Sequence, residues 1–181
     1  MNTEQQKETN RIIVCGVLGI ITMVYLALII CVNVQHFNYK MNSDIGAEAV
    51  LARLIWNSGE MVPSTWISST ETRIIATPQL AALFYGWTGD MNLGLGLACC
   101  VMTTGILLAI WCFMKKAGFR TESCLLMCVL SLALSGNMTI LELLYLFASY
   151  YGIHVITFFF IMNCYVMLIC WSEGEYKQHS I

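Results

Sequence analysis

The chain has 181 residues, and only 11% of them are charged, whereas a soluble globular domain carries roughly 25%. Hydrophobic residues make up 58% of the chain and the mean hydropathy is +0.70. A soluble fold would lack the polar residues to cover its surface, and intrinsic disorder is excluded by the same numbers. The net charge of −2 and the absence of a basic stripe exclude a nucleic-acid partner. The composition predicts an integral membrane protein.

Four long stretches contain no Asp, Glu, Lys or Arg, and each is long enough for one membrane crossing of about 20 residues. The predicted transmembrane helices span residues 12–34, 92–113, 123–137 and 153–171. Treating the last two stretches as one helix would give roughly 75 Å, too long for any bilayer, so a hairpin is predicted at 138–152. The predicted fold class is all-α, a polytopic membrane protein with about four transmembrane helices.

The orientation follows from the basic residues in the short connections. Lys7 and Arg11 precede the first span, and Lys115, Lys116 and Arg120 lie between the second and third. Both segments are expected on the cytoplasmic side. The predicted order is a cytoplasmic tail at 1–11, an outer loop at 35–91, a cytoplasmic loop at 114–122 and a cytoplasmic tail at 172–181. The expected location is the plasma membrane, with the lipid bilayer as the first partner.

A first short helix is predicted in the outer loop, over residues 44–57. Its apolar positions recur at helical spacing, at Ala47, Val50, Leu51, Leu54 and Ile55. Gly59 marks its end. This apolar face is expected to lie in the membrane interface, with Glu48 and Arg53 on the wet side.

A second short helix is predicted over residues 78–88, because Thr77 can cap a helix that has Pro78 at its first position. A break is expected at Gly86 or Gly89. Between the two helices runs a polar segment that ends with Glu71 and Arg73. Two interfacial helices joined by this segment would form a lid over a site at the membrane surface.

The remaining motifs favour packing over chemistry. Cys124 and Cys128 share a helix face without a nearby His or carboxylate, so we expect small packing residues and neither a metal nor another cofactor. The spacing of Gly94 and Ala98 permits close approach of a neighbouring helix. The aromatic residues of the 138–152 hairpin, Tyr145 among them, are expected to form a belt at its outer end.

The loop resembles a known family. The helix Asp44–Arg53, the following Gly59–Pro63, and the stretch from Thr77 to Asn92 look like the start of the GT-C membrane glycosyltransferases. The resemblance covers roughly residues 12–113, and it implies sugar transfer from a polyprenyl-phosphate donor to an acceptor at the outer leaflet. Family members have many more spans, so the chain would correspond to the N-terminal part of such an enzyme or to a small protein that keeps its opening module.

The resemblance implies a role for each candidate residue. Asp44 matches the position of the family's catalytic acid and would be the base that deprotonates the acceptor hydroxyl. Glu71 would be a second carboxylate that orients the acceptor or tunes Asp44. Arg73, with Arg53 as the weaker choice, would face the departing lipid phosphate.

Each role has a simpler alternative. Asp44 would cap a surface helix, and Glu71 with Arg73 would form an exposed ion pair of little energetic value. The rival function is a non-catalytic membrane protein that packs against other helices as a subunit or scaffold. A transporter or channel piece fits less well, because apart from His154 no ionisable group other than cysteine and tyrosine lies within a predicted span.

Overall fold

The computed structural model describes residues 3–35, 43–67, 75–133, 141–142, 144–146 and 151–179. Every long regular element in these ranges is an α-helix. The helices are α1 (Thr3–Gln35), α2 (Ser43–Ser58), α3 (Thr77–Thr88), α4 (Met91–Lys116), α5 (Thr121–Ala133) and α7 (Gly152–His179). The predicted all-α class is therefore confirmed for the described part of the chain.

Three helices are long and apolar enough to cross a membrane: Glu4–Gln35 in α1, Met91–Lys116 in α4 and Gly152–Trp171 in α7. The helix α5 has 13 residues, so it rises only about 20 Å, or two-thirds of a hydrocarbon layer of roughly 30 Å. The helix α5 covers residues 123–133 of the third predicted span, 123–137, and residues 134–137 lie outside the described ranges.

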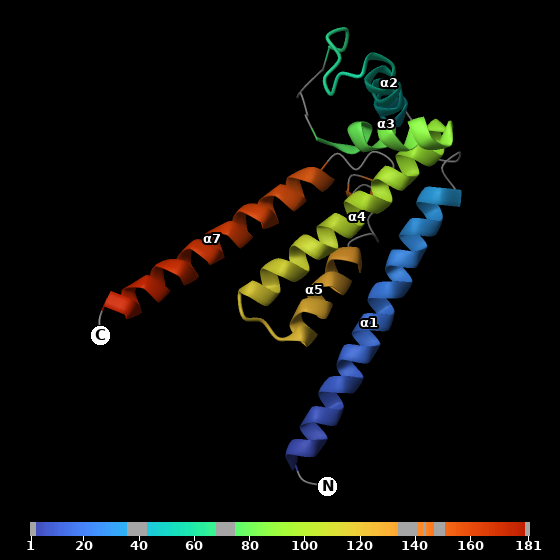
Figure 1. Ribbon diagram of the computed structural model, residues 1–181. Coiled ribbons are helices and arrows are strands. Elements are labelled where there is room, and N and C mark those ends of the chain that lie inside the picture. Colours follow the sequence, from blue (N-terminus) through green and yellow to red (C-terminus); the bar gives the residue numbers. More distant parts are fainter. Residues whose placement is uncertain are drawn as a thin grey trace.

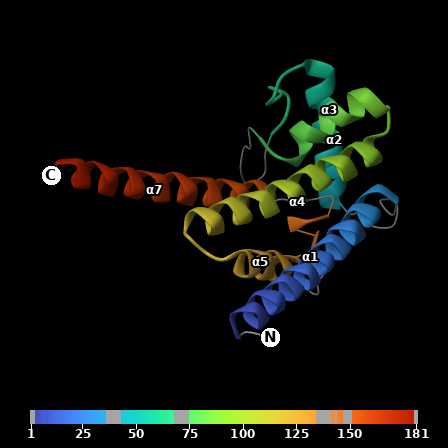
Figure 2. The ribbon, with the colours of Figure 1, turned by 60° about the horizontal axis from the view of Figure 1, so that its bottom comes forward.

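The helix α4 is the centre of the arrangement (Figure 1). It packs against α1, α2, α3, α5 and α7. The short helices α2 and α3 form a layer at the end of α4 where Met91 lies, and α7 runs away from α1 toward its C-terminus (Figures 1 and 2). An apolar core joins this layer to the spans and contains residues of α2, α3 and α4 together with Leu146.

The junction between α3 and α4 is a tight turn. Gly89 has a φ of 72°, in the left-handed region that favours glycine, and its N–H donates to the Tyr85 carbonyl at 2.8 Å. The Asp90 carboxylate then caps α4 by accepting from the N–H of Asn92 at 2.9 Å. This turn folds α3 back against the first turns of α4.

Gly94 permits the close contact between the two helices. A Cβ at this position would lie 3.0 Å from the Ala81 carbonyl oxygen and 3.1 Å from the Tyr85 nitrogen. Gly94 and Ala98 are both buried. The helix that approaches these small residues is α3, a short helix of the end layer.

The start of α3 differs from the prediction. Thr77 is inside the helix and buried, and its hydroxyl makes no hydrogen bond, so it is not the cap. The residue before the helix is Ala76, whose N–H donates to the Gln79 side chain at 2.9 Å. Gln79 also donates to the Met61 carbonyl at 3.3 Å, which ties the preceding loop to α3.

The segment 144–146 lies inside the helix bundle rather than at an outer edge. Tyr145 and Leu146 are each 1% exposed, and Tyr145 packs in a core with residues of α1, α4 and α5. The predicted aromatic belt is therefore wrong for Tyr145. The reason is a hydrogen bond at 2.8 Å from its hydroxyl to the Ser131 carbonyl, near the C-terminus of α5.

Candidate functional site

The predicted base, Asp44, is the second residue of α2 and is exposed. It lies in the first turn of the helix, where the positive end of the helix dipole stabilises a carboxylate. Both the catalytic interpretation and the simpler capping interpretation place an exposed carboxylate here. The position of Asp44 does not separate the two.

The predicted phosphate ligand Arg53 contacts α3 instead of Asp44. Its guanidinium carbon lies 5.8 Å from the centroid of the Tyr85 ring, within the range of a cation–π interaction. Arg53 follows Asp44 by nine residues, which corresponds to about half a turn plus two full turns of helix, so the two side chains leave opposite sides of α2. They are also separated by roughly 13 Å along the axis. One small reacting group cannot contact both.

The other two predicted site residues, Glu71 and Arg73, lie outside the described residues. Their roles as acceptor-orienting carboxylate and phosphate ligand stay predictions. Of the four candidates, the structure therefore places Asp44 and Arg53, and it does not bring these two together.

The main difference between the predicted and the observed helix α2 concerns the burial of Glu48. It was expected on the wet side of the helix, but it is only 7% exposed. The face of α2 that packs against the other helices consists of Ile45, Glu48, Ala52 and Ile55, at helical spacing. Val50, on the face predicted to be apolar, is 54% exposed. The side of α2 that packs against protein therefore includes Glu48, and the stripe through Val50 that was predicted to face the membrane interface is a different, exposed side.

A buried polar cluster, which we define as Asn33, Cys99 and the carbonyl groups of Tyr145 and Leu146, joins α1 and α4. The Asn33 amide donates to the Tyr145 carbonyl at 2.8 Å, and the Cys99 thiol donates to the Leu146 carbonyl at 3.1 Å. Asn33 and Cys99 are both 0% exposed.

The chemistry of this cluster is that of a structural anchor. Buried carbonyl groups outside a helix need donors, and the amide of Asn33 and the thiol of Cys99 supply them. The two bonds fix the segment 144–146 between α1 and α4. Within the described residues, no group of three His, Cys, Asp or Glu side chains is placed to hold a metal ion.

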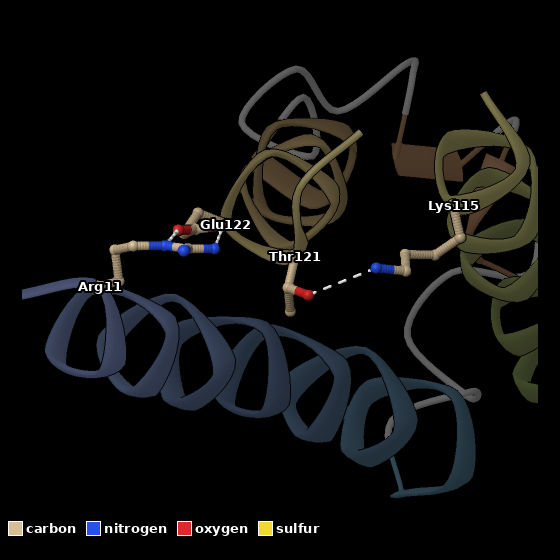
Figure 3. A network of polar contacts seen from close by, with 4 residues as sticks. All are labelled: Arg11, Lys115, Thr121 and Glu122. Atoms are coloured by element: carbon tan, nitrogen blue, oxygen red, sulfur yellow. Dashed lines mark hydrogen bonds and ion pairs between the residues drawn. The ribbon is translucent and has the colours of Figure 1, made fainter. Parts of the chain in front are cut away.

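A second polar network lies at the opposite end of the spans (Figure 3). The Arg11 guanidinium of α1 forms an ion pair with the Glu122 carboxylate of α5, and the Lys115 ammonium of α4 lies 3.5 Å from the Thr121 hydroxyl. The hydrogen bond from Arg11 lowers the pKa of the Glu122 carboxyl below its usual value. This network joins the ends of α1, α4 and α5.

Comparisons of the chain with family models, with curated proteins and with solved structures found no match. The resemblance to the GT-C glycosyltransferases therefore rests on the residues quoted for it. The geometry of α2 and α3 is the remaining guide to function.

Proposed function

We propose that this chain is a multi-pass protein of the plasma membrane, with both termini cytoplasmic, that acts as a non-catalytic subunit or scaffold for other membrane helices. The observation that carries the proposal is the separation of Asp44 and Arg53 on opposite sides of α2, with Arg53 held against Tyr85. Arg53 in this position supports the contact between α2 and α3, and within the described residues it does not converge with Asp44 on one substrate.

The exposed lengths of α1 and α7 also support a role in assembly. In the most apolar 18-residue stretch of α1 and of α7, only 6% of the residues are buried inside the protein. In the corresponding stretch of α4 the buried share is 56%. The helix α7 packs mainly on α4, which leaves most of its apolar surface for lipid or for another helix. A chain whose central helix is enclosed and whose flanking helices are open is suited to packing against neighbours within a bilayer.

A second candidate is the glycosyltransferase module that the sequence resembles, acting together with further membrane helices. It is favoured by the exposed carboxylate of Asp44 in a layer of two helices at the ends of the spans (Figure 1). In this case Asp44 would be the base, and the polyprenyl-phosphate-linked sugar would be the donor.

One substitution separates the two candidates. In cells that lack the protein, Asp44→Asn should restore the wild-type phenotype as fully as the unmodified chain, with equal amounts of protein in the membrane fraction. Glu8→Gln removes an exposed carboxylate from α1 and serves as the matched control. Loss of function in Asp44→Asn alone, at normal protein levels, would contradict the scaffold proposal and support the enzyme.

A further inference from the structure

The cysteine thiols of the chain differ in their exposure and in their depth within the spans. Of the nine cysteines, three are buried and three are exposed on the outside of the bundle. The exposed ones are Cys112 on α4 and Cys164 and Cys170 on α7. An exposed thiol in a span can be modified only where a reagent at the membrane surface reaches it.

Charged residues mark the depth of two of these thiols. A lysine or a glutamate is costly inside the hydrocarbon layer, so each of them lies at or beyond the surface of that layer. Cys112 precedes the exposed Lys115 by three residues of α4, a rise of about 4.5 Å. Cys170 precedes Glu173 by three residues of α7. Both thiols therefore lie within one helical turn of the membrane surface.

These two thiols lie at the same end of the bundle. The helices α4 and α7 pack against each other, and the Lys116 ammonium lies 2.9 Å from the sulfur of Met167, which precedes Cys170 by three residues. Basic residues such as Lys115 and Lys116 favour the cytoplasmic side of a membrane. Both thiols would thus be reached from the cytoplasm.

Other cysteines share only one of the two properties. Cys124 lies two residues after Glu122, near the same surface, but it is fully buried. Cys164 is exposed but lies nine residues before Glu173, about 13 Å below the surface. Cys15, near the start of the first span, is half-buried. Exposure and depth together thus select two thiols and leave a control for each property.

We infer that Cys112 and Cys170 are sites of reversible S-acylation by a long-chain fatty acid. The cysteine sulfur attacks the carbonyl carbon of a long-chain acyl-coenzyme A thioester. A new sulfur–carbon bond forms, the bond to the coenzyme sulfur breaks, and the departing coenzyme thiolate takes up the proton that the cysteine gives up. Leu108 and Met167, one turn deeper on the same helix sides, are 58% and 56% exposed, so each attached chain can lie along apolar surface. The inference rests on the cytoplasmic orientation in the proposed function.

The test is labelling of the full chain in cultured animal cells supplied with an alkyne-tagged palmitate. The measured quantity is the label released by neutral hydroxylamine, which cleaves thioesters, relative to the amount of protein in the membrane fraction. Cys112→Ala and Cys170→Ala should each remove about half of this label, and the double variant should remove all of it. Cys124→Ala, at a similar depth but buried, and Cys164→Ala, exposed but deeper, should leave the label unchanged.

Two results would overturn the inference and leave the proposed function untouched. One is a wild-type chain without hydroxylamine-released label. The other is a loss of label in Cys124→Ala or Cys164→Ala as large as in Cys112→Ala, because exposure and depth would then not select the modified thiols. A different result, reaction of Cys170 with a membrane-impermeant maleimide added outside intact cells, would overturn the proposed orientation and the inference with it.

Discussion

The hydrogen bond from the Tyr145 hydroxyl to the Ser131 carbonyl allows a specific prediction about the free energy of unfolding. Ser131 belongs to α5, and its carbonyl accepts a hydrogen bond from a residue outside that helix. The Tyr145 hydroxyl donates to this carbonyl at 2.8 Å from a side chain that is 1% exposed. Tyr145→Phe removes the donor and keeps the ring, so the hydrogen bond to the Ser131 carbonyl is lost.

The expected cost of this change is about 1–2 kcal/mol, between the net contribution of one hydrogen bond and the penalty for a group left fully unsatisfied. In a chain of this size the melting temperature should fall by roughly 2–8 °C. The measurement is thermal unfolding in detergent followed by near-ultraviolet circular dichroism. The matched control is Tyr151→Phe, because Tyr151 is 50% exposed and should change the melting temperature little. Equal shifts in the two variants would refute the placement of Tyr145 inside the bundle.

Two further predictions concern packing and charge. Gly94→Val should lower the melting temperature by several degrees, because overpacking costs about 1–3 kcal/mol, whereas Gly16→Val, with no atom within 4 Å of its Cβ, should not. Arg11 lowers the pKa of Glu122, so the ion pair stabilises the fold fully above the unfolded pKa of about 4.3, and this stabilisation is lost as the pH falls through the lowered pKa. The melting-temperature difference between the wild type and Glu122→Gln should therefore be present at pH 7 and disappear in acid, and a constant difference would contradict this account.

The helical class of the protein could be predicted from the sequence, because long apolar stretches without charges leave few alternatives. Helices α2 and α3 occupy the two stretches of the loop where capping residues, glycine and apolar spacing predicted helices. These signals are local, since they depend on the backbone and on residues within one or two turns.

The packed face of α2 could not be predicted in the same way. The helix carries one apolar stripe through Val50 and Leu54 and another through Ile45, Ala52 and Ile55. Periodicity finds both stripes but does not say which one contacts protein. Glu48 makes the second stripe polar in the sequence, although this carboxylate is buried and belongs to the packed side.

The burial of Tyr145 could not be predicted from the residues next to it in the sequence either. A tyrosine near the end of an apolar stretch is typical of the membrane interface. Its place inside the bundle depends on Asn33, which is 112 residues away and donates to its carbonyl, and on the carbonyl of Ser131. A contact between such distant residues leaves no pattern in a single sequence.

The length of the short turn between α3 and α4 determines which side of α3 faces α4, as well as the direction of the chain. Both helices are continuous up to this turn, so deleting or adding one residue would rotate the facing side of α3 by about 100° relative to α4. Gly94 would then face different side chains of α3. Insertions are accordingly expected to be tolerated near the exposed Gly59 and excluded between Thr88 and Met91, a pattern that would appear directly in a scan of single-residue insertions along the loop.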